Sequence, residues 1–288
     1  MGTATTGACR NGFSASKRCL RRAVGGGRRY QSVATDIRQA TGWYVYAVCE
    51  PGDLKLTGLE SVDGGHPLET ISGDGVSVIV SEVRLAALQG LEEEAPTEDG
   101  RLAQMARRHD AVVEAAFSQG TLLPLRLGTV LRDRKAVAQL LSGAGPYFRD
   151  ELQRLRGCRE WQVKVLREHQ SERSSEEGRD FGSGTAYLAA RAAAQKERDE
   201  TATKLNVALE RLDAGAATAA DASEPIRWLT QGTLYAAAFL VPGQQEAAFQ
   251  DAVEQGGAGL RELGVGVELR GPFPPYHFVD AKLGGGPQ

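Results

Sequence analysis

One histidine in this chain has a setting that could support chemistry. His109 lies between Met105 and Val112 on the apolar side of an amphipathic pattern that runs from Arg101 to Phe117. An imidazole can act as a general base near neutral pH, but no serine or cysteine stands at a readable spacing from this one. The pattern favours a buried histidine that is hydrogen-bonded within a core. An enzyme centred on His109 is the alternative.

Other reactive residue types do not form a recognisable site. Gly182-Ser183-Gly184-Thr185 opens an expected helix, where an anion could bind, but glycines in this position more often belong to a flexible loop. The chain has no phosphate-binding loop, His-Glu-x-x-His, Gly-x-Ser-x-Gly or Cys-x-x-Cys motif. The remaining histidines, His66, His169 and His277, are isolated from one another. The cysteines are expected to be unpaired thiols in a reducing cytoplasm: Cys9, Cys19, Cys49 and Cys158. The sequence therefore predicts no catalytic residue, no cofactor and no metal.

The elements of the first half are predicted from hydrophobic periodicity and turn residues. Asp133 is expected to cap a short helix that ends at Leu141, because glycines and Pro146 follow. The other elements are a strand over Trp43–Val48, a hairpin of Pro67–Ile71 with Val76–Val80, a helix over Arg101–Phe117, extended chain over Leu122–Val130 with Pro124 at a sheet edge or a bulge, and a second helix over Tyr147–Leu155.

The second half has a simpler order. Its expected elements are a strand over Glu160–Leu166, a helix over Thr185–Leu212, a linker over Asp213–Ser223, a strand pair of Ile226–Leu229 and Thr233–Val241, a helix over Gln245–Val253 and a strand over Val265–Leu269. This β-α-β-β-α-β order is the ferredoxin-like arrangement. We therefore expect an α+β protein with two domains, an N-terminal α+β domain with extra helices over 42–157 and a ferredoxin-like domain over 158–271, followed by a proline-rich aromatic tail over 272–288.

Charge is segregated along the chain. Residues 1–41 carry eight Arg or Lys and one Asp, and they are expected to form a disordered basic extension, to lie upstream of the true start, or to act as a transit peptide. Residues 42–157 carry 12 basic and 17 acidic residues, and residues 158–280 carry 13 and 19. An acidic body argues against nucleic-acid binding, and no apolar run reaches the roughly 20 residues of a membrane span.

Two segments are candidates for protein contacts. The segment from Gly271 to Val279 holds three prolines that present Phe273, Tyr276 and Phe278, as either a binding element or a strap packed on the second domain. In the segment from Leu123 to Val130, one arginine interrupts an apolar run. Burial of Arg126 in an ion pair is favoured over exposure on a contact surface.

Six short motifs in order resemble the gas vesicle protein F/L family, from Trp43 to about Asp280. They are Tyr44-Val45-Tyr46, His109, Leu123-Pro124-Leu125-Arg126 with Gly128-Thr129-Val130, Trp161 with Val163-Lys164-Val165, Ala186-Tyr187-Leu188, and Gly271-Pro272 with Pro274-Pro275-Tyr276. The chain departs from the family pattern at Leu127, Gln162 and Phe273, which bears on the subfamily, F or L.

The resemblance implies an accessory or minor structural protein of gas vesicles that is not an enzyme. Its implied partners are the major shell protein and other accessory proteins, in the cytoplasm and at the vesicle. From side-chain chemistry alone, the contact candidates are Phe273, Pro275 and Tyr276, with Leu125 and Arg126 second. A ferredoxin-like nucleic-acid-binding or regulatory module is the other alternative, because Gln231–Val241 is similar to an aromatic RNA-binding strand. Core packing of Tyr235 and Phe239 is favoured there.

Overall fold

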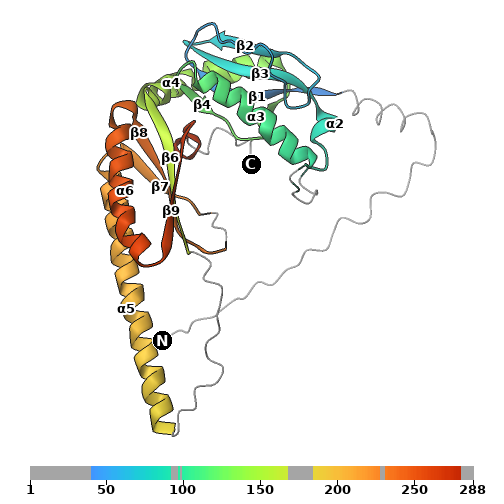
Figure 1. The fold of residues 1–288 in the computed structure, drawn as a ribbon. Helices are drawn as coiled ribbons and strands as arrows, with labels where there is room; N and C mark the ends of the chain where they lie inside the picture. Colours follow the sequence, from blue (N-terminus) through green and yellow to red (C-terminus); the bar gives the residue numbers. More distant parts are fainter. Residues whose placement is uncertain (1–39, 92–96, 98, 168–183, 228–230, 280–288) are drawn as a thin grey trace, which may run out of the picture.

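Two antiparallel sheets with helices packed against them make up the protein (Figure 1). The structure is a computed structural model that describes residues 40–91, 97, 99–167, 184–227 and 231–279. The predictions for the basic extension and for His169 therefore lie outside the described residues.

The first sheet has the order β2-β3-β1-β4. The predicted hairpin is confirmed as β2 (Leu68–Gly73) with β3 (Val76–Arg84). β1 (Thr41–Cys49) pairs with β3, with β4 (Leu122–Pro124) and with the short β5 (Val130–Leu131). Pro124 lies in β4 at the end of this order, as predicted, where its missing N–H removes no bond from the sheet centre.

Helices cover both faces of the first sheet. Every residue of β1 after Thr41 is buried. On one face, Tyr44 and Tyr46 pack with Met105 of α3 (Arg101–Phe117), and on the other, Val45 packs with Phe148 of α4 (Arg134–Leu155). The short helix α2 (Leu85–Leu88) follows β3. This double burial explains why β1 is apolar at successive positions rather than at alternate ones.

The prediction of two helices between Asp133 and Leu155 is wrong, because α4 continues through Pro146. Asp133 does cap the helix, since its carboxylate accepts the N–H of Ala136 at 2.7 Å. A proline inside a helix removes one backbone bond and costs about 3 kcal/mol. Apolar burial on both sides of Pro146 offsets that cost: the buried residues are Val137, Leu141, Phe148, Leu152 and Leu155.

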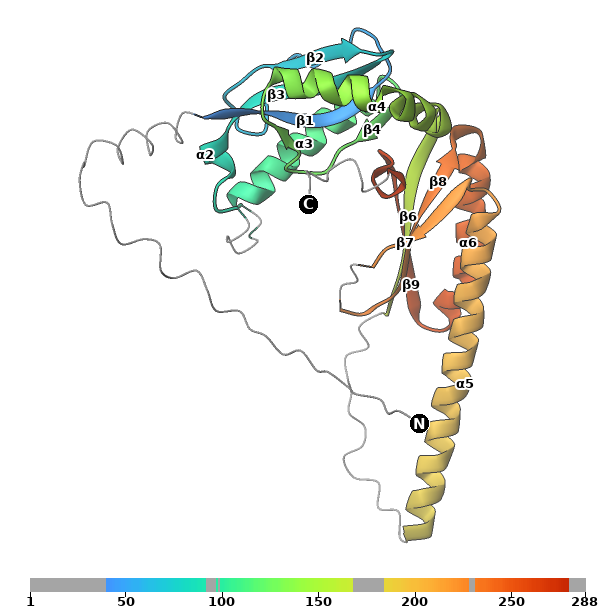
Figure 2. The same cartoon turned by 180° about the vertical axis from the view of Figure 1, so that it is seen from behind.

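The second sheet has the order β7-β8-β6-β9, and all three pairings are antiparallel. Its strands are β6 (Cys158–Arg167), β7 (Ala222–Pro225), β8 (Thr233–Pro242) and β9 (Val265–Phe273). The helices α5 (Gly184–Ala217) and α6 (Glu246–Glu262) lie side by side over one face of it (Figures 1 and 2). The chain thus passes through the predicted β-α-β-β-α-β order. Tyr235 and Phe239 pack in the core beneath these helices, as favoured above.

Several boundaries in this half differ from the predictions. The segment expected to be a linker, Asp213–Ser223, contains the last turn of α5 and the start of β7. The strand that pairs with β8 lies at Ala222–Pro225, before the predicted Ile226–Leu229, of which residues 228 and 229 lie outside the described residues. The Ile226 N–H still donates to Ala236 O at 2.9 Å. The helix predicted to end at Val253 continues to Glu262. Small residues caused these errors, because alanine and glycine give a weak periodic signal.

The two sheets share a core. After the short 3-10 turn η1 (Gly243–Gln245) and α6, strand β9 extends past Leu269 to Phe273, and a second 3-10 turn, η2 (Tyr276–Phe278), follows. Phe278 is 8% exposed and belongs to the cluster that contains Phe148 of α4 and Leu240 of β8. The last described residues are therefore packed where the two halves meet.

Candidate functional site at the junction of the two sheets

Residues 273–279, which we call the C-terminal clasp, connect elements of both halves. The Tyr276 hydroxyl donates to a carboxylate oxygen of Asp110 on α3 at 3.1 Å. The Arg154 guanidinium on α4 donates to the carbonyl of Phe278 at 2.7 Å. Pro274 and Pro275 are buried. The segment therefore packs across the junction, whereas the strap expected from the sequence would pack on the second domain alone.

A buried carboxylate holds the clasp to the second sheet. Glu160 of β6 has no exposed surface, and its two oxygens accept the backbone N–H of His277 at 2.9 Å and the imidazole Nδ1 at 2.7 Å. Gln162 donates a third bond at 2.9 Å. The hydrogen bond to Glu160 raises the pKa of His277, and the charges of Glu160 and Glu224 act in the same direction against burial. This geometry favours an imidazolium–carboxylate pair.

A second polar network lies under α3. The Tyr44 hydroxyl accepts the N–H of Gly128 at 3.0 Å and is 3.0 Å from Nδ1 of His109. His109 is 2% exposed, so the prediction of a buried, hydrogen-bonded histidine is confirmed. Burial lowers the pKa of His109, although the charge of Asp110 and the Leu125 backbone oppose the shift. A neutral ring enclosed in this way is placed to support the fold.

The predicted contact residues differ in exposure. Leu125 is 4% exposed and Pro275 is buried, so both can affect a contact surface only by supporting the exposed residues above them. Phe273 is half-buried, whereas Tyr276 is 36% exposed despite its bond to Asp110. The predicted ion pair of Arg126 is wrong: Arg126 is exposed, and no salt bridge involves it within the part of the chain that the structure describes. Flanking Leu125 turns inward in its place.

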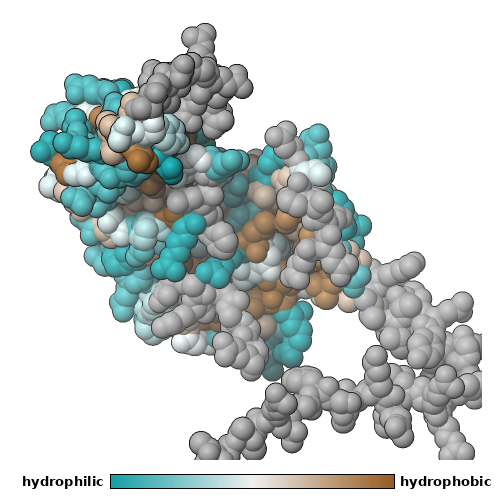
Figure 3. All heavy atoms as spheres, turned by 90° about the horizontal axis from the view of Figure 1, so that it is seen from below, coloured by the Kyte–Doolittle hydropathy of each residue, from teal (hydrophilic) through white to brown (hydrophobic). Residues whose placement is uncertain are grey.

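The two predicted contact segments meet at α3. On α3, Asp110 accepts a hydrogen bond from Tyr276, and the neighbouring His109 is hydrogen-bonded to Tyr44. Tyr44 in turn accepts the N–H of Gly128, two residues after Arg126. Leu127, which the sequence did not single out as a contact, is 38% exposed in this same loop. Seen from below, hydrophobic residues gather between hydrophilic ones on the face of the molecule (Figure 3). Within the two predicted segments, Leu127, Arg126 and Tyr276 are therefore the exposed side chains that a partner could reach.

Neither metal binding nor membrane crossing is supported within the described ranges. No three His, Cys, Asp or Glu residues there are grouped to hold a metal ion. No helix there is long and apolar enough to span a bilayer. The described cysteines, Cys49 and Cys158, are buried free thiols, and burial raises the pKa of the Cys49 thiol to about 11, which keeps it protonated.

Sequence reasoning missed the Glu160–His277 pair. Strand alternation places Glu160 opposite the buried Trp161 face, where a solvent-exposed residue is expected. The clasp covers that position, and 117 residues separate the partners. No local signal could have shown the contact.

The fold is similar to solved gas vesicle proteins. The crystal structure of GvpF from Anabaena sp. PCC7120 matches with a TM-score of 0.59 at 23% identity, covering 84% of this chain and 97% of that one. The crystal structure of GvpF from Microcystis aeruginosa matches with a TM-score of 0.54 at 22% identity, covering 83% and 99%. These matches identify the class of protein by its fold: mixed sheets and helices of the GvpF type.

Sequence comparison gives the family. Gas vesicle protein L from Streptomyces sp. (strain CB03234) is 35% identical over 254 residues, which cover 82% of this chain and 92% of that protein. Gas vesicle protein F1 from Halobacterium salinarum is 22% identical, covering 84% and 94%. Residues 42–280 match the family of gas vesicle synthesis proteins GvpL/GvpF. The chain belongs to this family, and its role lies in gas vesicle formation.

Proposed function

We propose that this protein is an accessory or minor structural component that binds the major gas vesicle shell protein and helps to nucleate or chaperone vesicle formation. The observation that carries the proposal is the exposure of Leu127 and Arg126 in the loop bonded to Tyr44, together with the exposure of Tyr276 in the clasp. Family membership directs this surface toward gas vesicle proteins. Its action is binding at the vesicle and in the cytoplasm rather than catalysis.

The chemistry of a shell subunit fits such a surface. A subunit that lines a gas space must present an apolar face, which would aggregate in water before assembly. Apolar side chains at the junction can cover part of that face, and the backbone that carries them is fixed by Asp110, Glu160 and Arg154. A pre-ordered surface loses less conformational entropy on binding than a mobile one.

The partition of the chain is part of the proposal. We infer that residues 42–157 and 158–271 are two domains and that the second is ferredoxin-like, with residues 272–288 as a tail. The strand order β7-β8-β6-β9 with two helices on one face supports this assignment. The shared cluster around Phe278 then serves as the interface between the domains.

The test is a calorimetric titration of the full chain with the purified shell subunit. Replacing both Phe273 and Tyr276 by alanine is expected to weaken binding by about 2–4 kcal/mol if both are anchors. Tyr276→Phe is the matched control: it keeps the ring, loses only the bond to Asp110, and should retain most of the affinity. Apolar binding should also persist at raised salt.

A melting curve of each variant separates contact from support. Lost affinity with an unchanged melting temperature supports the contact. Unchanged affinity in the double variant removes Phe273 and Tyr276 from it, and Arg126→Ala and Leu127→Ala then test the neighbouring loop. Absence of any binding by the unsubstituted chain overturns the proposal.

A further inference from the structure

Helix α5 extends far beyond the rest of the second half. Its C-terminal part packs on the sheet and on α6, while its N-terminal part projects past the end of the sheet (Figure 1). Every residue from Arg191 to Lys204 is exposed, which is about four turns with no covered face. A helix that is polar all round and packs on nothing is marginal in water, unless a partner covers it.

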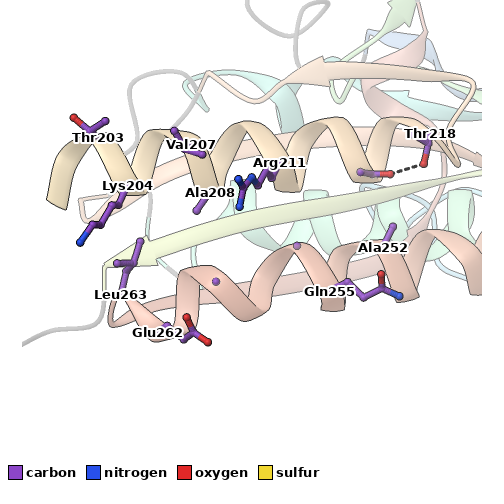
Figure 4. A pocket seen from close by; sticks show the side chains of 13 residues that line it. Thr203, Lys204, Val207, Ala208, Arg211, Thr218, Ala252, Gln255, Glu262 and Leu263 are labelled. Carbon is purple, nitrogen blue, oxygen red and sulfur yellow. Dashed lines mark hydrogen bonds between the residues drawn. The ribbon is translucent and has the colours of Figure 1, made fainter. Parts of the chain in front are cut away.

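A groove runs between α5 and α6 on the outer side of the second half (Figure 4). Lys204, Val207 and Arg211 line it from α5, and Glu262 lines it from α6. Val207 is 42% exposed there.

Two glycines of α6 in the groove differ in their surroundings. A Cβ at Gly256 would lie 2.9 Å from Cα of Leu212, so close packing of α5 on α6 requires glycine there. A Cβ at Gly259 would meet nothing within 4 Å. Glycine in a helix interior is destabilising relative to alanine, so packing within the chain does not account for Gly259. It leaves backbone open on the floor of the groove.

The face of α5 that lines the groove continues along its projecting part. With 3.6 residues per turn, Lys204 and Arg211 share a stripe with Glu200 and Glu197, which lie one and two turns before Lys204. The projecting half of the stripe is thus acidic, and the half in the groove is basic. No ion pair of Glu197, Lys204 or Arg211 occurs among the residues that the structure describes, and Glu200 makes only an exposed pair with Lys196 at 3.8 Å.

We propose that α5 pairs with α5 of a second copy of this chain, antiparallel about a twofold axis near residue 202. This placement sets the projecting half of each helix in the groove of the other copy. It brings Glu200 of each copy to Lys204 of the other, with Glu197 within one turn of Arg211. Because the stripe carries opposite charges on either side of the axis, it is complementary to itself, and the contact closes as an isologous dimer.

Side-chain size agrees with this pairing. On the projecting half the stripe continues through Ala193 to Ala190, and Ala190 would lie next to Gly215 of the other copy. Small residues on both sides let helix axes approach closely. The projecting segment of about 18 residues and the groove-lining segment from Thr203 to Thr218 are also similar in length, at 1.5 Å per residue.

The experiment is sedimentation velocity of the full chain in reducing buffer over a wide range of concentration. The unsubstituted chain is expected to dimerise. One variant carries Glu197→Lys with Glu200→Lys, and another carries Lys204→Glu with Arg211→Glu. Each faces itself with like charges, so its dimer dissociation constant should rise by about tenfold or more. An equimolar mixture of the two variants should restore the dimer as a heterodimer.

Controls keep the outcome decisive. Arg198→Glu with Asp199→Lys reverses charges on other faces of the same helix turns and should leave the dimer unchanged. Circular dichroism checks that every variant stays folded. A monomer at all concentrations overturns the proposal, and so does a dimer that neither reversed variant weakens or that their mixture fails to restore.

Discussion

Two histidines near the junction differ in the group that each imidazole meets. His109, under α3, lies against the neutral hydroxyl of Tyr44, and burial lowers its pKa. His277, in the clasp, lies against the carboxylate of Glu160, and that bond raises its pKa. The same residue type is thus held neutral inside one half and favoured as a cation where the halves meet.

The difference follows from what each region can bury. The interior under α3 is closed by α3 and β1, so the uncharged form of the ring is the stable one. The clasp side chain of His277 keeps 32% of its surface exposed, so an imidazolium can be solvated on one side while it pairs with Glu160 on the other. The Glu160 carboxylate also fixes the orientation of the clasp, because it accepts hydrogen bonds from both the backbone and the ring of His277.

The largest expected effect comes from removing the cation at the junction. His277→Ala leaves Glu160 buried without a charged partner, and breaking a buried pair in this way costs about 3–5 kcal/mol. Urea unfolding at neutral pH measures the loss. The double variant Glu160→Gln with His277→Gln replaces the pair by amides and should recover part of it. A loss below about 1 kcal/mol for His277→Ala would show that the pair behaves as an exposed one.

The backbone beside the pair is the next target. Gly271 has a φ of +139°, and a Cβ there would lie 2.9 Å from the Glu160 carbonyl oxygen and 3.0 Å from the Trp161 ring. Gly271→Ala is therefore expected to destabilise the fold by about 2–3 kcal/mol. Gly259→Ala is the matched control and should be neutral or stabilising by up to about 1 kcal/mol. Equal thermal denaturation midpoints for the two variants would contradict the argument.

The interior network was more predictable from the sequence than the junction was. The amphipathic spacing around His109 placed it in a core, and the strand patterns at Trp43, Val76 and Trp161 located three buried strands. Each of these signals is local. The Glu160–His277 and Asp110–Tyr276 contacts join residues separated by 117 and 166 positions, and the sequence carries no periodicity at that range.

Helix ends failed for a different reason. Local rules end a helix at Pro146 or in the small-residue stretch after Leu212, because they weigh only backbone propensity. The tertiary contacts of Phe148 and Ala216 outweigh these local costs. The prediction that Arg126 is buried failed for a similar reason. Its neighbour Leu125 is the side chain that packs into the core, and Arg126 is left exposed.

Within the interior network, His109→Gln is expected to cost about 1–3 kcal/mol, because it disturbs the bond to Tyr44 in a site without water access. Tyr44→Phe should cost a similar amount, since it removes the acceptor of the Gly128 N–H as well. A double-mutant cycle of chemical denaturation should show that the two losses are not additive. Additive losses would mean that the two side chains act independently. Unchanged stability with lost activity in vesicle formation would restore a functional role for His109.

The smallest effect is the most specific, because the two histidines should respond to pH in opposite directions. An unperturbed histidine has a pKa of about 6.5. The pKa of His277 is raised, so its contribution to the free energy of unfolding is fully present below about 6.5 and is lost as the pH rises through the folded value. The pKa of His109 is lowered, so its contribution is present above about 6.5 and is lost as the pH falls toward the folded value. His277→Gln should flatten the decline in stability above that pH. His109→Gln should flatten the decline below it.

Urea titrations at several pH values measure both slopes, and NMR titration of the imidazole protons assigns them. Coincident midpoints for the two rings would remove the distinction between the neutral interior and the charged junction.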